Sequence, residues 1–264
     1  MKRVFITGAS SGLGAALARR YAQQGAVLGL LARRRDMLEQ LVQSLPQPDT
    51  QQRHHVYAVD VTDHAAVAAA AQDFMRTEGG VDIVIANAGI SAGTLTEYSE
   101  DLAVFERILA TNVTATAATF APFIAAMKQQ AKDGSRDCRL VGIASVAGIR
   151  GLPGAEAYSA SKAAVISYCE SLRLELKSSG IKVVTIAPGY IDTPMTRGNP
   201  YPMPFLMPAD VFATKAAGAI EDGVSYRVIP WQMGVVAKVL RLLPNWLYDL
   251  AFSKAPHKPR HAKP

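Results

Sequence analysis

The chain has 264 residues, of which 49% are hydrophobic and 19% are charged, and its formal net charge is +6. This length and balance fit one globular α/β domain with buried parallel strands. They argue against nucleic-acid binding, because the cationic excess lies in the C-terminal tail and no nucleic-acid reader motif accompanies it, so we expect no nucleic acid partner.

The chain opens with an expected strand, a glycine-rich turn and a helix. Residues 4–6 are apolar, residues 7–14 read TGASSGLG, and residues 15–21 have the pattern of an amphipathic helix. Glycine lets the backbone turn tightly and approach a pyrophosphate, and a helix N-terminus presents free N–H groups to phosphates. This order predicts the first part of a dinucleotide-binding βαβ unit, here with GxxxGxG spacing.

The residues after the second expected strand, 26–31, bear on the choice of cofactor. Enzymes that use NAD place an acid here to hold the ribose hydroxyls, whereas this chain has Arg33, Arg34 and Arg35. A guanidinium attracts a 2′-phosphate and binds it with two hydrogen bonds. We therefore predict NADPH rather than NADH, with Ser10 as an added donor. The alternative is a solvated helix start, which fits Arg35 better than Arg33.

Polar or small residues follow three further expected strands, at the sheet edge where ligands bind in open α/β folds. The strand 56–61 ends in Asp60 and its neighbour, and this carboxylate can accept a hydrogen bond from an adenine amino group. Small residues at 86–89 follow the next strand and let a cofactor lie close to the backbone. Ser145 follows the fifth strand, 139–144.

Tyr158 and Lys162 stand four residues apart in an expected helix, so their side chains share one face. An unperturbed tyrosine has a pKa of ~10. Lowering it to ~7 takes roughly 4 kcal/mol, which one positive charge at ~4 Å supplies at an effective dielectric of ~20. Lys162 would then tune Tyr158 for general acid–base chemistry; the alternative is an exposed Tyr and Lys on an ordinary helix. Asn112 lies inside another expected helix. Asparagine is unfavourable there, so we expect its side chain to have a specific role.

Together these segments resemble the short-chain dehydrogenase/reductase family. The chain carries TGASSGLG at 7–14, ANAG at 86–89, YSASK at 158–162, and Pro188-Gly189 with Thr193, all in the family's order and approximate spacing. The likeness extends from residue 2 to about residue 195. One small departure is Ala86, where the family more often has asparagine.

The resemblance implies a role for each matching residue. Tyr158 donates a proton to a carbonyl during reduction, and Lys162 lowers the pKa of that phenol and bonds the nicotinamide ribose. Ser145 stabilises the substrate oxygen, and Asn112 anchors a water in a proton relay. The residues expected to contact NADP(H) are Gly8, Ser10, Ser11, Gly12, Leu13, Gly14, Arg33, Arg34, Asp60, Val61, Asn87, Ala88, Gly89, Tyr158, Lys162, Pro188, Gly189, Ile191 and Thr193.

Strand and helix patterns alternate along the matched region, which predicts βαβ units with right-handed crossovers. The expected fold class is α/β, a Rossmann-like doubly wound parallel sheet of about seven strands flanked by helices on both faces. Residues 1–230 would form the catalytic and cofactor-binding domain. Residues 231–264 would extend the same domain as an apolar helix and a basic tail.

The segment 190–208 is rich in proline, methionine and aromatic residues. Prolines stiffen it, and methionines adapt to irregular apolar surfaces. We interpret it as a lid over an apolar substrate, with Phe205, Leu206 and Met207 as lining residues; the alternative is ordinary packing of a loop onto the core.

Residues 231–250 are strongly apolar, and the tail beyond them carries four cations and no acid: Lys254, Lys258, Arg260 and Lys263. An amphipathic helix with a basic tail can lie on an anionic membrane surface. The alternative is a helix packed on a partner subunit or on the substrate loop, with a disordered tail. Family members commonly form homodimers or homotetramers through long helices, here 100–131 and 156–179, but this ending departs from the family's usual glycine-rich one.

The chain begins its first strand at once, which predicts no signal peptide, and no apolar run of ~20 residues predicts a transmembrane helix. Cys138 and Cys169 then fit a reducing, cytoplasmic compartment, and no metal-ligand spacing appears. The leading hypothesis is an NADPH-dependent oxidoreductase of an apolar ketone or aldehyde. The alternatives are a 3-oxoacyl-thioester reductase and a non-catalytic cofactor-sensing or scaffold protein.

Overall fold

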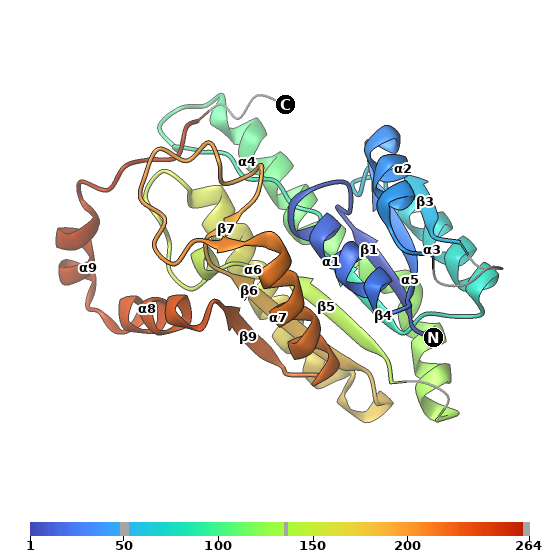
Figure 1. Cartoon of the computed structure of the whole chain (residues 1–264). Coiled ribbons are helices and arrows are strands. Elements are labelled where there is room, and N and C mark those ends of the chain that lie inside the picture. Colours follow the sequence, from blue (N-terminus) through green and yellow to red (C-terminus); the bar gives the residue numbers. More distant parts are fainter. Residues whose placement is uncertain (48–52, 135–136, 261–264) are drawn as a thin grey trace.

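The computed structural model describes residues 1–47, 53–134 and 137–260. Their centre is a seven-stranded sheet with the order β3-β2-β1-β4-β5-β6-β9, in which every neighbouring pair is parallel (Figure 1). The strands are β1 (Arg3–Thr7), β2 (Val27–Ala32), β3 (His55–Ala58), β4 (Ile83–Ala86), β5 (Arg139–Ile143), β6 (Lys182–Pro188) and β9 (Tyr226–Ile229). A second, two-stranded sheet joins β7 (Ile191–Asp192) to β8 (Met207–Pro208). The predicted doubly wound parallel sheet is confirmed.

Helices cover both faces of the sheet because strand residues alternate between two cores. Val4 and Ile6 of β1 pack in one core, whereas Phe5 between them packs in the other. The first core takes α1 (Gly12–Gln23), α2 (Arg35–Ser44) and α7 (Ala209–Glu221). The second takes α3 (His64–Glu78), α5 (Ala115–Lys132) and α6 (Glu156–Glu175). A sheet buried on both faces explains the nearly continuous apolar strands of the sequence.

A single long helix runs from residue 101 to residue 132 and comprises α4 (Asp101–Leu109), a π-helical turn η1 (Ala110–Thr114) and α5. By length and composition alone it could cross a membrane, although the sequence analysis expected no such helix. Phe120, Phe123 and Met127 are nevertheless fully buried in the second core. Buried core helices of soluble proteins pass the same test.

The C-terminal region differs from the expected single helix. It forms α8 (Trp231–Leu242) and α9 (Asn245–Phe252), and the break falls at Leu243 and Pro244 because proline has no N–H to continue a helix. Residues 253–260 then pack along the loop that follows β4, so the expectation of a disordered tail is wrong for these residues. Residues 261–264, which include the cation Lys263, lie outside the described residues.

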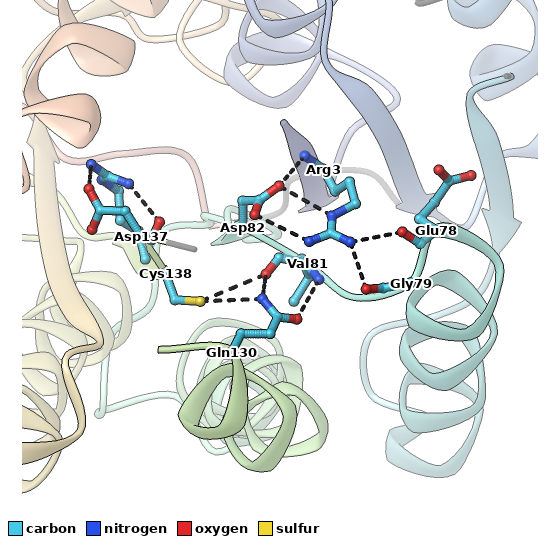
Figure 2. Close-up of polar contacts among 9 residues, drawn as sticks. Arg3, Glu78, Gly79, Val81, Asp82, Gln130, Asp137 and Cys138 are labelled. Atoms are coloured by element: carbon cyan, nitrogen blue, oxygen red, sulfur yellow. Dashed lines mark hydrogen bonds and ion pairs between the residues drawn. The ribbon is translucent and has the colours of Figure 1, made fainter. Parts of the chain in front are cut away.

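At the amino edge of the sheet, opposite the candidate site, buried polar groups join β1 to β4 (Figure 2). The Asp82 carboxylate accepts hydrogen bonds from the backbone N–H of Arg3 at 2.7 Å and from its Nε at 3.3 Å. The same guanidinium donates to two carbonyls at the end of α3. Nearby, the side-chain amide of Gln130 bonds both the N–H and the carbonyl of Val81. This network fixes the register of the two central strands.

Replacing Asp82 with alanine leaves the Arg3 guanidinium buried without its carboxylate. We expect the free energy of unfolding to fall by about 3–5 kcal/mol, the range for breaking a buried pair. Urea unfolding followed by circular dichroism measures this loss. Asp210→Ala, which removes an exposed pair with Arg19, is the control and should cost at most about 1 kcal/mol. Equal effects of the two substitutions would contradict the assignment.

Candidate active site

The loops after β1 and β4 approach each other so closely that side chains are excluded. A Cβ on Gly8, which has φ +66°, would lie 2.7 Å from the Cα of Ala88. A Cβ on Gly14 would lie 2.3 Å from the carbonyl oxygen of Gly8. The side-chain amide of Asn87 closes the contact by donating to the carbonyls of Thr7 at 3.0 Å and Gly8 at 3.2 Å. The predicted glycine-rich turn is therefore held by backbone contacts at the carboxyl edge of the sheet.

Helix α1 begins at Gly12 and leaves its first N–H groups without a capping side chain. Its N-cap residue, Ser11, makes no side-chain cap bond, and the first turn holds no acid. Gly12 has φ +54°, and a Cβ there would lie 3.5 Å from the buried side chain of Thr193. The free N–H groups, the bare glycine backbone and the missing acid suit a phosphate. The residues fit the dinucleotide that the sequence analysis expects.

One of the predicted arginines, Arg34, contacts the same turn, and its neighbour Arg33 pairs with Asp60. Nη2 of Arg34 donates to the hydroxyls of Ser10 and Ser11, each at 3.1 Å. Nη1 of Arg33 lies 3.9 Å from a carboxylate oxygen of Asp60, and both side chains are largely exposed. The Arg34 guanidinium after β2 and the two hydroxyls of the glycine-rich turn thus form a donor set that suits a phosphate monoester, with the Arg33 guanidinium on the next residue.

The remaining predicted contact residues are buried or partly buried. Pro188 ends β6, and the N–H of Gly189 is tied to β9. Ile191 is buried in β7. Val61 is buried in the second core, and Leu13 is partly buried against the first. These two side chains pack in the cores, so their part in a cofactor site would be through the backbone.

Asn112 lies in the π-helical turn η1 and is fully buried. Its Oδ1 accepts from the N–H of Ile90 at 2.8 Å, and its Nδ2 donates to the carbonyl of Ile90 at 3.0 Å and to the Ser161 hydroxyl at 2.9 Å. A Cβ on Gly89 would lie 3.2 Å from this Oδ1 and 3.5 Å from Nζ of Lys162. A π-turn commonly marks a functional site. The hydrogen bonds that Asn112 makes from this turn explain why an asparagine lies inside a helix.

Tyr158 and Lys162 lie at this edge on α6, with the Ser145 hydroxyl beside the phenol. Burial raises the pKa of Tyr158, and the hydrogen bond from Ser145 offsets this in part. The ammonium of Lys162 donates to the carbonyl of Ile143 at 2.9 Å and lies 5.8 Å from the centre of the Tyr158 ring. Burial also lowers the pKa of Lys162 to about 8.

The expected lowering of the Tyr158 pKa by Lys162 is therefore not met in the chain alone. Desolvation disfavours the phenolate, and the ammonium is turned to the Ile143 carbonyl. The geometric part of the expectation holds, because both side chains lie on one helix face beside Ser145.

The segment 190–208 places two tyrosines near Tyr158, and these are not the residues that were expected to line a lid. Tyr190 and Tyr201 pack at 6.4 Å between ring centres, and the Tyr158 phenol is among the groups that raise the pKa of Tyr201 to about 12, after burial and Tyr190. Phe205 and Leu206 are 50% and 47% exposed. Met207 belongs to β8 and packs against the first core.

Sequence reasoning missed two residues beside Tyr158. Ser161 links the Asn112 amide to α6, and its only sequence signal was its place between Tyr158 and Lys162. Lys258 was counted only as a tail cation, yet its Nζ lies 5.7 Å from the centre of the Tyr158 ring. No local pattern around position 258 announces this approach, since it depends on contacts with a distant loop.

Comparisons with known proteins show the family to which the chain belongs. The family model described as short chain dehydrogenase matches residues 2–201. A protein of Myxococcus xanthus described as an uncharacterized oxidoreductase is 35% identical over 254 residues, which cover 95% of this chain and 96% of that protein. A 2-dehydro-3-deoxy-L-rhamnonate dehydrogenase (NAD(+)) of Sphingomonas sp. is 35% identical over 190 residues, 72% of each chain.

A solved structure shows the same arrangement of elements. The crystal structure of a 3-ketoacyl-(acyl-carrier-protein) reductase from Brucella melitensis, complexed with NADH, has a TM-score of 0.77 and 27% identity. The match covers 86% of this chain and 96% of that one. The fold, the site and these likenesses place the chain in the short-chain dehydrogenase/reductase family of oxidoreductases, which act on CH–OH and C=O groups.

Proposed function

We propose that this chain is an NADPH-dependent oxidoreductase that reduces a carbonyl to an alcohol, or catalyses the reverse reaction, with Tyr158 as the proton donor. The observation that carries the proposal is the meeting of Tyr158, Ser145 and Lys162 at the sheet edge where the glycine-rich turn opens. The cofactor, when bound, supplies or accepts the hydride. The protein then has to manage one proton and the charge on the carbonyl oxygen.

In the direction of reduction, the Tyr158 hydroxyl donates its proton to the carbonyl oxygen, and Ser145 donates a hydrogen bond to the same oxygen. The phenol is protonated at neutral pH, as this role requires, but burial raises its pKa and so makes it a weaker acid. The Lys162 ammonium stabilises the phenolate that the transfer leaves behind. Asn112 holds the loop at Ile90 against α6, and we assign it the water of a proton relay.

The residues that would hold NADP(H) are those of the glycine-rich turn, the loop after β4 and the segment after β6. The preference for NADPH rests on this chain's own Arg33 and Arg34, because the Sphingomonas relative is described with NAD(+) and the Brucella structure holds NADH. A 2′-phosphate beside Arg34 would replace its contacts with the Ser10 and Ser11 hydroxyls by charge-assisted bonds.

The substrate class in this proposal is an apolar ketone or aldehyde, supported by the aromatic side chains Tyr190 and Tyr201 near Tyr158. The second candidate is a 3-oxoacyl-thioester reductase, favoured by the likeness to the Brucella protein. The intact catalytic set argues against a scaffold that binds the cofactor without chemistry.

An apolar stripe on α8 suggests a contact surface. Trp231, Val235, Val239 and Leu242 are each more than half exposed, and Lys238 flanks them. We propose a cytoplasmic protein that forms a homodimer or homotetramer, with peripheral contact to an anionic membrane as the alternative use of this stripe. Sedimentation with and without anionic vesicles distinguishes the two, and a monomer that ignores vesicles contradicts both.

Tyr158→Phe removes the proton donor and keeps the ring. We expect turnover to be lost for every carbonyl that the native chain reduces, while the Kd for NADPH stays within about twofold, because the phosphate contacts are untouched. Nicotinamide absorbance measures turnover, and protein fluorescence quenching measures Kd. Tyr168→Phe, on the same helix, is the control and should remain active. Turnover retained by Tyr158→Phe would remove the phenol as the acid.

Arg34→Ala should weaken NADPH binding by roughly 10- to 100-fold, the loss expected for one charge-assisted contact, and leave NADH binding nearly unchanged. Arg33→Ala should act in the same direction. Arg35→Ala is the matched control, because Arg35 pairs with Glu39 on its own helix. Equal native affinity for NADPH and NADH would refute the assignment.

The pH dependence of kcat/KM for carbonyl reduction should follow Lys162. Its pKa lies below the usual lysine value, at about 8, so the ammonium is present at neutral pH and is lost as the pH rises through that value. Without it, the phenolate left by Tyr158 has no neighbouring charge. We expect kcat/KM to be flat from pH 6 to about 7.5 and to fall above about 8, up to tenfold per pH unit. A profile that stays flat to pH 10 would contradict this role.

A further inference from the structure

The C-terminal strap, residues 253–260, crosses the candidate active site. It leaves α9, passes over the loop that follows β4 and ends beside the start of α4 (Figure 1). The carbonyl of Pro259 accepts a hydrogen bond from the N–H of Gly93 at 2.9 Å. This bond joins the strap to the loop that also carries Ile90 and Ser91.

Two glycines make room for the strap. A Cβ on Gly93 would lie 2.2 Å from the carbonyl oxygen of Lys258. A Cβ on Gly154, which has φ +67°, would lie 2.6 Å from the Cβ of His257. The strap therefore docks in one register, since its backbone occupies the space that ordinary side chains at these positions would need.

Arg260 fastens the end of the strap. Its Nε donates to the Asp101 carboxylate at 2.9 Å, and its Nη2 donates to the Glu100 carboxylate at 3.0 Å. The guanidinium also lies 3.5 Å from the centre of the Tyr98 ring. Asp101 is only 2% exposed, so this pair is shielded from solvent on the side of the carboxylate. Two ion pairs and the contact with the Tyr98 ring thus hold Arg260, which is two positions after Lys258.

The anchored strap brings the Lys258 ammonium to the catalytic tyrosine. Nζ of Lys258 donates to the Ser91 hydroxyl at 2.7 Å and lies 5.7 Å from the centre of the Tyr158 ring. Burial lowers the pKa of Lys258. Among the described residues, no carboxylate forms an ion pair with this ammonium, in contrast to Arg260.

A partly buried ammonium that bonds one neutral hydroxyl keeps unused donors and an uncompensated charge, which is costly. The cost falls when an anion joins it. The groups that fit the cofactor phosphates, the glycine-rich turn and the arginines after β2, lie elsewhere. The position left for an anion at Lys258 is therefore that of the substrate, beside the phenol that would meet the carbonyl.

We propose that Lys258 is a specificity-determining residue, placed by the C-terminal strap to bind an anionic group, such as a carboxylate, on the same molecule that presents its carbonyl to Tyr158. The inference rests on the proposed function, and it narrows the substrate class to apolar carbonyl compounds that also carry an acid. A positively charged residue at this place selects such an acid over its neutral ester.

The test uses pairs of carbonyl acids and their methyl esters: phenylglyoxylate, levulinate and para-acetylbenzoate. For at least one pair, we expect the native chain with NADPH to favour the acid by roughly 10- to 100-fold in kcat/KM, the value of one hydrogen bond to a charged group. Calorimetry of the same pairs with the NADP-loaded chain should give a matching ratio of Kd values. Lys258→Met should abolish both preferences by weakening the acid alone, and Lys258→Arg should restore them in part.

Two further variants separate charge from position. Lys254→Met removes an exposed cation of the same tail and should keep the preference for the acid. Gly93→Ala leaves Lys258 intact but pushes the strap away, and it should lose the preference while limited proteolysis cuts the released tail.

Each other outcome overturns the inference. Equal kinetics and binding of acid and ester in the native chain show that no anion is selected. If Lys258→Met lowers kcat/KM equally for acid and ester, the lysine acts on Tyr158 and not on the substrate. If it raises kcat/KM equally for both, Lys258 and the strap obstruct the site. Native chain that binds no acid of the panel also contradicts it. Failure of the proposed function is seen separately, as turnover retained by Tyr158→Phe.

Discussion

The side-chain amide of Asn112 joins the parts of the molecule on which the site depends. Its three hydrogen bonds tie the backbone at Ile90 to Ser161 on α6. The loop after β4 thereby becomes one unit with α6, the helix that bears Tyr158 and Lys162. Because the amide is fully buried, each polar group left without its partner would carry a desolvation penalty of about 1–3 kcal/mol. The same loop carries Ser91 and Gly93, so the position of the strap depends on this amide as well.

Most of the fold could be read from the sequence because its signals are local. Apolar runs alternate with helical patterns, and glycines mark the turn after β1, where only they fit. The third strand was placed too long, since β3 ends at Ala58 and Asp60 lies in the following turn. Apolar character continues past the hydrogen-bonded residues there, so composition alone could not locate the end. The break of the last helix was signalled by Pro244, whose effect was outweighed by the apolar pattern on both sides.

The sequence predicts a set of site residues, of which the structure brings Tyr158, Lys162 and Ser145 together, but it does not predict their electrostatics. The sequence analysis considered charge alone and therefore made Lys162 the dominant influence on the pKa of Tyr158. The spacing of four residues between them is visible in the sequence. Desolvation has no such signal, since it depends on all elements that cover the ring, and it acts in the opposite direction. The strap escaped prediction for a related reason. Its contacts join positions such as Lys258 and Ser91, which are far apart in sequence and show no periodicity.

The strap also separates two tasks that enzymes often combine in one scaffold. The proposed reacting groups lie on α6 and after β5, whereas a short peripheral segment, attached by one backbone bond, two tight glycines and one arginine, adds a charge from outside. Altering the residues of the strap would then change which molecules are accepted and leave Tyr158, Ser145 and Lys162 unchanged. The strap is therefore a segment in which substitutions, natural or engineered, can change substrate selectivity while the rest of the site stays the same.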